Sequence, residues 1–254
     1  MVGGSNTMLY RVEGIVLRTM DYGETHKIIT LITNNSGKVG VLVRGAKKVR
    51  SKHASLAQPF TYGEFSFVRN TGLGTLQTAE IISSNHSLRS DLDLSAHASY
   101  IAELTDRGIL EDEVNVQHFE QLKACFAALS DGKDFEVVTQ LYELKVLQMT
   151  GYSPVVEECI HCGNHVGPFK MSFYSGGIVC SRCSSNDASL LLISDSALKL
   201  LRFFKGIDMR RIGNITVSAE TKKELTILIR GLIDAQLGLK LKTRKFLDNL
   251  GKLV

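Results

Sequence analysis

Long apolar segments and a secretory leader are both missing from this chain of 254 residues. No apolar run approaches the roughly 20 residues that a helix needs to span a bilayer, so we expect no membrane partner. The N-terminal residues MVGGSNTM have neither the basic start nor the apolar centre of a signal peptide. We expect residues 1–7 to be a short leader or an expression remnant, Met8 to be the natural start, and the protein to be cytoplasmic.

Cysteine is scarce, with five residues in the whole chain. A secreted disulfide scaffold is usually short and dense in cysteine, so the sequence indicates a reducing compartment. Four of the five cysteines fall in one cluster, between residues 159 and 183. The fifth, Cys125, lies on the apolar side of a predicted helix, and we expect it to be a buried, unreactive thiol.

Common sequence motifs of enzymes are missing as well. The chain has no phosphate-binding Gly-x-x-x-x-Gly-Lys-Ser/Thr loop, no dinucleotide-binding Gly-x-Gly-x-x-Gly after a strand, and no Gly-x-Ser-x-Gly nucleophile elbow. Gly72 and Gly74 fall between two predicted strands and are interpreted as part of a hairpin turn. The seven histidines are scattered along the chain. We therefore predict that the protein is not an enzyme.

The first third of the chain has the pattern of β-strands. Apolar and polar residues alternate in YRVEGIVLRTM, HKIITLIT, KVGVLVRG, FTYGEFSFVRN and TLQTAEIIS, and the turn sequences NNSG and TGLG separate some of them. Five short strands in succession suggest a small barrel, of which the OB-fold is the common five-stranded type. We predict an OB-fold nucleic-acid-binding domain over residues 1–83.

Residues 84–254 change to the period of a helix. The five predicted helices cover residues 95–110, 115–132, 134–151, 194–206 and 218–238. The third is apolar over most of its surface and should be the central one. The predicted fold class is α+β: a five-stranded OB-fold barrel followed by a mainly helical domain, with a four-cysteine zinc-binding insertion at residues 155–190.

The clustered cysteines form two Cys-x-x-Cys pairs with 17 residues between them. This spacing is typical of a zinc ribbon, in which each pair provides two sulfur ligands from one tight turn. We predict one structural zinc ion per chain. Its predicted ligands are Cys159, Cys162, Cys180 and Cys183.

A catalytic role for this metal is not favoured. A catalytic zinc keeps an open coordination position, usually with three protein ligands, whereas four cysteines complete a tetrahedron. Zinc deaminases carry proline directly before a Cys-x-x-Cys pair, but Val-Val-Glu-Glu precedes Cys159. His161 and His165 are alternative ligands, and we expect both to face solvent because four cysteines are present.

Charge is distributed unevenly along the chain. The net charge is +5 over residues 1–80, −9 over residues 81–158 and +8 over residues 159–254. Such segregation indicates an anionic partner for the two basic parts, unless they face the acidic middle within one fold. We expect the acidic middle either to contact basic parts of the chain or to receive a basic protein partner.

A basic connector, VRGAKKVRSKHASLAQPF, follows the third predicted strand. It contains no acidic residue, and a basic connector on a small barrel can form a groove that follows a nucleic-acid backbone. The alternative is a solvated surface loop. The candidate DNA-binding residues of the connector are Arg44, Lys47, Lys48, Arg50 and Lys52. The candidate stacking rings, of which the phenylalanines are better explained as core residues, are Tyr22, Phe60, Tyr62, Phe65 and Phe67.

A second basic run, LGLKLKTRKFLDNLGK, lies near the C-terminus, after the long predicted helix and before a short apolar one. One interpretation is a second phosphate-contacting patch. The other is a set of basic residues near a helix C-terminus, where the helix dipole favours cations. The candidate DNA-binding residues of this run are Lys240, Lys242, Arg244 and Lys245.

The order of these parts resembles the RecO family of bacterial recombination mediators, from about Met8 to the end of the chain. The resemblance rests on EGIVLRTMDYGETHKIITLIT, on GYSPVVEECIHCG with GGIVCSRC, on RGAKK followed by QPF, and on the terminal KTRKFL. The cysteine pairs alone would be unspecific, whereas the last two sequences make the match specific. Family members differ in whether they keep the cysteines, which implies that the metal is not the source of activity.

The resemblance implies a DNA-binding recombination mediator associated with the nucleoid. It implies binding of single- and double-stranded DNA, annealing of complementary strands, and remodelling of single-strand-binding protein so that a recombinase can load, together with the partner RecR.

The alternative is a zinc-ribbon adaptor between proteins with an incidental basic loop, and a metallohydrolase is a third class. Steep salt dependence of DNA binding would favour the mediator, whereas salt-insensitive association with another protein would favour the adaptor.

Overall fold

The computed structural model describes residues 8–111, 113–184 and 189–250, and it divides the chain into two compact units. Unit 1 contains the residues up to Ser130 and those from Thr243 onward, and unit 2 contains Asp131–Lys242. The leader expected at residues 1–7 lies outside the described part. Among the described helices, none has both the length and the apolar character required to cross a bilayer.

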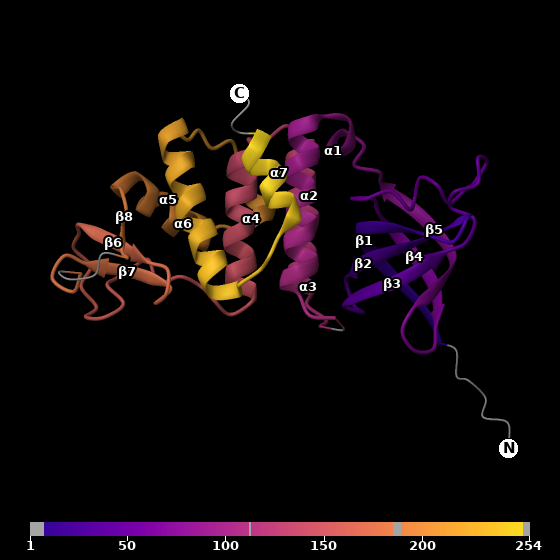
Figure 1. Ribbon diagram of the computed structural model, residues 1–254, viewed down its shortest axis with the longest axis horizontal. Coiled ribbons are helices and arrows are strands. Elements are labelled where there is room, and N and C mark those ends of the chain that lie inside the picture. The colour runs from indigo at the N-terminus through magenta and orange to yellow at the C-terminus, as the bar shows by residue number, and fades with distance from the viewer. Residues whose placement is uncertain (1–7, 112, 185–188, 251–254) are drawn as a thin grey trace, which may run out of the picture. The chain divides into compact units, whose positions relative to one another are not determined.

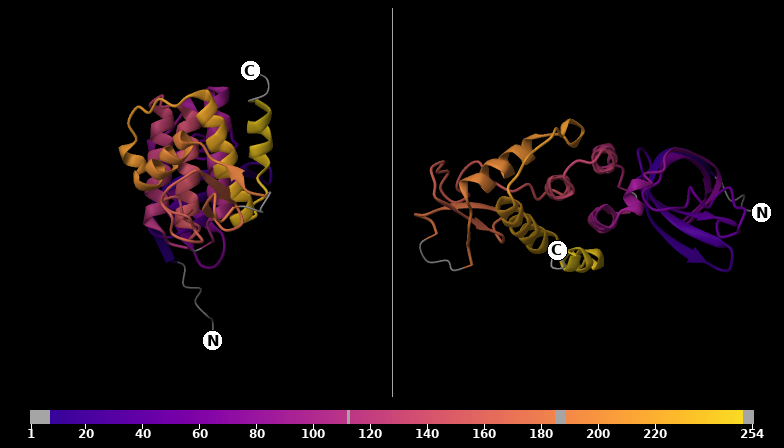
Figure 2. Two further views of the ribbon diagram at one scale, coloured as in Figure 1. Left: turned by 90° about the vertical axis from the view of Figure 1, so that its left-hand side faces the viewer. Right: turned by 90° about the horizontal axis from the view of Figure 1, so that it is seen from above.

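Five strands of unit 1 form a closed barrel in the order β1-β2-β3-β5-β4 (Figure 1). Neighbouring strands are antiparallel, except that β3 and β5 pair in parallel through Val41–Gly74 and Leu42–Thr75. This barrel confirms the predicted OB-fold, and the right view of Figure 2 shows it from above. The strands are β1 (Met8–Tyr22), β2 (His26–Thr33), β3 (Lys38–Val43), β4 (Tyr62–Arg69) and β5 (Gly74–Ser83).

The barrel interior is filled by side chains from alternate strand positions, as the period of two requires. Strand β1 pairs with β4 along its first half and with β2 along its second, and its register shifts between Val16 and Arg18. Gly74 allows the barrel to close, because a Cβ there would lie 2.8 Å from the ring of Phe67. The strand residues of the core are Val12, Val16, Ile29, Leu31, Val39, Val41, Val43, Phe65 and Phe67.

Three helices follow the barrel within unit 1, although the first predicted domain ends with β5. Helix α2 begins three residues before the predicted start, because Asp91 accepts a hydrogen bond from the N–H of Leu94 and caps the helix. Cys125 on α3 is fully buried, as expected, and burial raises its pKa well above the ordinary value. The helices are α1 (Ser87–Ser90), α2 (Leu92–Gly108) and α3 (Val116–Ser130).

The chain returns to unit 1 through its last helix, α7 (Lys242–Leu250). The N–H and the hydroxyl of Thr243 both donate to Oε2 of Glu103 on α2, at 2.8 and 2.6 Å. A carboxylate at this position satisfies N–H groups at the start of a helix and complements its dipole. Leu247 is the buried residue of α7.

Unit 2 combines three longer helices with a small three-stranded sheet of order β7-β6-β8. Helix α4 is the central helix that its composition predicted, since every residue from Val137 to Leu147 is buried. Asp134, Ser194 and Ser218 cap α4, α5 and α6 by accepting backbone hydrogen bonds. The elements are α4 (Phe135–Met149), β6 (Phe169–Ser172), β7 (Gly177–Cys180), β8 (Leu191–Leu192), α5 (Asp195–Gly206), the 3-10 helix η1 (Met209–Arg211) and α6 (Ala219–Leu237).

Candidate metal centre and nucleic-acid interface

The four clustered cysteines come together in unit 2, in a cysteine module that we define as residues 155–184. Their sulfur atoms all lie within 4.8 Å of one another, and 3.7 Å separates Sγ of Cys162 from Sγ of Cys180. Cys159 and Cys180 are buried, whereas Cys162 is exposed. Four thiols this close together could hold a metal ion.

Tight turns place both cysteine pairs. Gly163 has a φ of 68°, and its N–H donates to the carbonyl of Cys159 at 2.8 Å. In the second pair, the N–H groups of Cys183 and Ser184 both donate to the carbonyl of Cys180 at 3.0 Å. Glycine adopts the left-handed conformation of the first turn without a steric penalty.

The electrostatics of the sulfur cluster favour a bound cation. Burial opposes ionisation of Cys159, but N–H groups that include that of Cys180, 3.3 Å from its sulfur, lower its pKa to about 6. Hydrogen bonding to Cys162 raises the pKa of Cys183 to about 12. Four neighbouring sulfurs therefore do not all ionise at neutral pH unless a cation neutralises them.

The cysteine module is attached to both α5 and α6. Arg202 of α5 donates to the carbonyl of Glu157 at 3.2 Å. Gln236 of α6 donates to the carbonyl of Phe173 at 2.7 Å, and the Phe173 ring packs on Gly231, where a Cβ would lie 2.6 Å away from it. The module is thus held on the helices by direct contacts as well as by chain connectivity.

Histidines do not extend the described sulfur cluster. His161 and His165 are exposed, as expected, and the ring of His165 lies 3.6 Å from Glu158. The chain contains one His-x-Glu sequence, His118 to Glu120. It lies on α3 in unit 1, whereas the cysteines lie in unit 2, and both ring nitrogens of His118 are buried without a hydrogen-bond partner in the described residues. Neither unit, as described, contains the complete pattern of a zinc deaminase.

The connector, which joins β3 to β4 in a series of turns, is partly integrated into the barrel core. Ala46, Leu56 and Ala57 are buried in the same cluster as the strand residues. Phe60 is buried with a φ of 69°, and its ring contacts Phe126 of α3. A freely solvated loop therefore does not describe this segment. All of its candidate DNA-binding side chains are nevertheless exposed: Arg44, Lys47, Lys48, Arg50 and Lys52.

The start of the connector is tied to the turn between β1 and β2. The N–H of Lys47 donates to the carbonyl of Thr25, and the N–H of Gly45 donates to Nδ1 of His26. Nζ of Lys47 lies 2.7 Å from Asp21, and this hydrogen bond lowers the pKa of the Asp21 carboxyl. The charge of Lys47 is therefore partly compensated. In the described part of the chain, the structure shows no such ion pair for Arg44, Lys48, Arg50 or Lys52.

The candidate stacking rings have different environments. Tyr22, at the end of β1, is 51% exposed, and its register partner is His26, which contacts the connector. Phe60, Phe65 and Phe67 are core residues, as expected. Tyr62 is half-buried and faces α3. Tyr22 is therefore the candidate ring that is available on the barrel surface.

The acidic middle of the sequence does contact basic residues of the barrel. Asp106, in the last turn of α2, lies 3.0 Å from Nε of Arg18 and 3.3 Å from Nζ of Lys38. The reverse pairing also occurs, since Nζ of Lys123 on α3 lies 3.6 Å from the carboxylate of Glu13 on β1. Of the two expectations for the acidic middle, contact with basic parts of the chain therefore holds for Asp106. Nothing in the local sequence indicated which acid would make this contact.

The C-terminal basic run is divided by the start of a helix. Lys240 follows the end of α6, whereas Lys242, Arg244 and Lys245 lie in the first turns of α7. Helix α6 has no basic residue in its last turn, and cations at the start of α7 are disfavoured by its dipole. The helix-dipole explanation therefore does not apply to Lys242, Arg244 or Lys245. Arg244 is half-buried and the other three are exposed.

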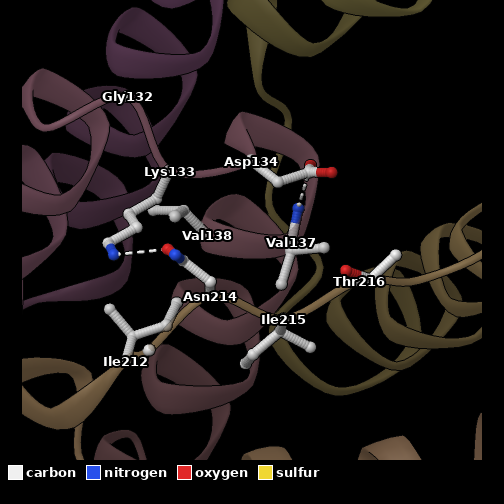
Figure 3. A pocket seen from close by; sticks show the side chains of 10 residues that line it. Gly132, Lys133, Asp134, Val137, Val138, Ile212, Asn214, Ile215 and Thr216 are labelled. Carbon is white, nitrogen blue, oxygen red and sulfur yellow. Dashed lines mark hydrogen bonds between the residues drawn. The ribbon is translucent and has the colours of Figure 1, made fainter.

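A small cavity of about 100 Å³ lies in unit 2 at the start of α4 (Figure 3). Nζ of Lys133 donates to Asn214 beside it at 2.6 Å, and Asp134 caps α4. Lys222 lies 2.6 Å from the Asp134 carboxylate. The cavity is far smaller than the roughly 300 Å³ at which ligand pockets usually begin, so we assign it no ligand.

Comparison with known proteins identifies relatives over almost the full chain. The family model "Recombination protein O N terminal" matches residues 8–85, and "Recombination protein O C terminal" matches residues 89–245. The DNA repair protein RecO of Bacillus pumilus is 42% identical over 243 residues, which cover 96% of this chain and 95% of that protein. The RecO of Bacillus subtilis shows the same identity and coverage.

The RecO protein of Bacillus cereus is 39% identical over 245 residues, which cover 96% of this chain and 99% of that protein. The N-terminal model covers the closed barrel, and the C-terminal model covers the helical part with the four adjacent cysteines. The resemblance expected from the sequence is therefore confirmed, and the chain belongs to the RecO family of recombination proteins.

Proposed function

We propose that this protein is a DNA-binding mediator of recombinational DNA repair, without enzymatic activity. Membership of the RecO family supports a role in DNA repair. The protein binds single- and double-stranded DNA through its barrel and anneals complementary strands. Together with RecR, it helps to load a recombinase onto DNA that is coated with single-strand-binding protein.

The exposed cations of the connector are the observation that carries this proposal. Lys48, Arg50 and Lys52 extend from a segment that Ala46, Leu56 and Ala57 anchor in the barrel core. Phosphate contacts of this kind position a nucleic acid without reading its sequence, and each neutralised phosphate releases counterions. Tyr22 on the neighbouring turn adds an exposed ring on which a base can stack.

A structural zinc ion is the second part of the proposal. A Zn–S distance of about 2.3 Å in a tetrahedron corresponds to sulfur atoms about 3.8 Å apart, which agrees with the 3.7 Å between Cys162 and Cys180. Cys159 and Cys183 complete the donor set. The ion contributes folding free energy to unit 2 and takes no part in a reaction.

The test of DNA binding is a variant with Lys48→Ala, Arg50→Ala and Lys52→Ala. Labelled single-stranded DNA is titrated at several salt concentrations, and the slope of log affinity against log salt should flatten by about 0.7 per lost contact. Binding should weaken equally for all sequences, and the rate of strand annealing should fall with it. The matched control replaces Lys240, Lys242 and Lys245 with alanine.

An unchanged salt slope in the connector variant would overturn the assignment of the connector. A loss of DNA affinity in the control variant would place the DNA contacts at the C-terminal run.

The adaptor function is retained as the second candidate because Tyr174, at the tip of the β6–β7 hairpin, is 95% exposed. Absence of DNA binding, together with a salt-insensitive protein complex that Tyr174→Ala weakens, would favour the adaptor.

A further inference from the structure

A second cationic surface lies on the barrel at the far end of the face that begins at the connector. Along this face, β1 pairs with β2 through Tyr22–His26, Met20–Ile28 and Arg18–Thr30. Strand β2 pairs in turn with β3 through Ile28–Leu42 and Thr30–Gly40. In OB-folds, the β2–β3 face and the β4–β5 loop form the oligonucleotide site. Here that face contains a pocket of about 260 Å³. Its lining residues include Arg18, Ile28, Lys38, Arg69, Leu73 and Glu111.

The pocket is lined by both cationic and apolar side chains. Arg18, Lys38 and Arg69 come from three different strands and all line the pocket. Leu73 of the β4–β5 loop is 43% exposed and lies against Gly40, where a Cβ would come within 3.0 Å of it. Cations beside an exposed apolar surface match a nucleotide, which presents an anionic phosphate next to the flat π-face of a base.

A carboxylate of α2 already pairs with two of these cations. Asp106 places one oxygen 3.0 Å from Nε of Arg18 and the other 3.3 Å from Nζ of Lys38, so it bridges cations on two strands. Lys38 also donates to the carbonyls of Asp106 and Ile109, at the end of α2. Glu111 lines the same pocket. Charge-assisted contacts of this kind are those that a phosphate oxygen also makes.

We propose that the pocket is a second phosphate site of the barrel, and that Asp106 and Glu111 shield it until a nucleic-acid strand displaces them. This inference rests on the proposed function, in which the barrel binds DNA. The distance along β1 from Tyr22 to Arg18 is about 13 Å at 3.3 Å per residue, so one strand of a few nucleotides reaches from the connector to the pocket. Occupation of the pocket then requires the end of α2 to separate from the barrel.

The test compares Asp106→Asn and Glu111→Gln with Glu64→Gln. Glu64 is an exposed residue of β4 that does not line the pocket, and its replacement changes the net charge by the same amount. With a labelled oligothymidylate as the probe, Asp106→Asn should raise affinity several-fold. Its salt slope should steepen by about 0.7 for one additional phosphate contact, whereas Glu64→Gln should leave the slope unchanged.

A second comparison identifies the pocket itself as the site. Arg18→Ala should weaken binding more strongly in the Asp106→Asn background than in the parent, because Asp106 pairs with Arg18 in the parent and leaves it available to DNA only when the carboxylate is removed. Non-additivity of this kind is expected for residues that share one site. Additive effects, or the same affinity and salt slope for Asp106→Asn and Glu64→Gln, would overturn the proposal and leave Asp106 as an internal ion pair.

These outcomes separate the inference from the proposed function. If the parent protein binds DNA and the connector variant does not, while Asp106→Asn changes nothing, only the second phosphate site fails. If the parent protein does not bind DNA, the proposed function fails. Because Asp106 is largely buried and its variant could lose stability, thermal unfolding is measured alongside. If the Asp106→Asn variant is unfolded, the test rests on Glu111, which is exposed. The DNA affinity of the Glu111→Gln variant must then exceed that of the Glu64→Gln variant, or the proposal is wrong.

Discussion

The cysteine module and the basic connector show two different relations between sequence and structure. In the module, the spacing of Cys159, Cys162, Cys180 and Cys183 predicted a cluster, and the four sulfurs lie together. In the connector, the charges predicted a surface, but their position depends on the burial of Leu56 and Ala57 and on hydrogen bonds to the β1–β2 turn. The spacing of four ligands around one ion determines where their sulfur atoms lie. The positions of charged side chains in a run, in contrast, depend on how the rest of the barrel holds that segment.

The largest expected effect is on the module. Cys159→Ser removes one of four ligands, and structural zinc contributes on the order of 10 kcal/mol to the folding of small zinc domains. We expect loss of stoichiometric metal and unfolding of the cysteine module in the variant, with little change in the barrel. Elemental analysis and thermal unfolding measure this. A parent protein purified without chelator that contains no stoichiometric metal would contradict the prediction.

The connector should be sensitive to mutation at its buried residues. Leu56 is 4% exposed, so Leu56→Ala should lower the free energy of unfolding by about 2–5 kcal/mol through lost packing and a cavity. Val49 in the same segment is fully exposed, and Val49→Ala should change stability by less than about 0.5 kcal/mol. Equal effects of the two substitutions, measured by denaturant unfolding, would show that the connector is not anchored.

The attachment of the module to α6 gives a third prediction. In a helix interior, Gly→Ala usually stabilises by about 0.5–1 kcal/mol. At Gly231, however, the added methyl group would press on the Phe173 ring, and overpacking costs about 1–3 kcal/mol. We expect Gly231→Ala to destabilise unit 2 in thermal unfolding. The control, Gly206→Ala, meets no atom within 4 Å and should be neutral or stabilising.

The smallest expected effect distinguishes two neighbouring lysines of the connector. Nζ of Lys47 is 2.7 Å from Asp21, so it must exchange one anion for another when DNA binds, whereas Lys48 is exposed. Lys47→Ala should therefore reduce DNA affinity less than Lys48→Ala at the same low salt concentration. Equal losses would mean that the ion pair with Asp21 opens at negligible cost, as exposed pairs often do.

Local patterns in the sequence predicted most of the architecture. The period-two alternation gave the five strands of the barrel, and the helical period gave α2 to α6, including the central position of α4. The elements α1, η1 and β8 were not predicted, because two to four residues are too few to establish a period. The start of α2 was missed by three residues, because its cap, Asp91, precedes the apolar pattern.

Long-range polar contacts could not be predicted in the same way. The charge pattern predicted contacts between acidic and basic residues, but nothing local distinguishes Asp106 from the other acids of the middle segment. Its contacts with Arg18 and Lys38 depend on how α2 packs against the barrel. The candidate DNA contacts remain predictions. The structure shows that these side chains are exposed, but the DNA that they would bind is not part of the chain.

The capping of α7 by Glu103 has a consequence for biosynthesis. Unit 1 is completed by residues from Thr243 onward, which the ribosome makes only after all of unit 2. Domains generally fold as units while the chain emerges from its N-terminal end. The barrel can therefore close early in translation, but α2 receives its partner helix last, so the nascent chain carries an incomplete unit 1 throughout the synthesis of the cysteine module.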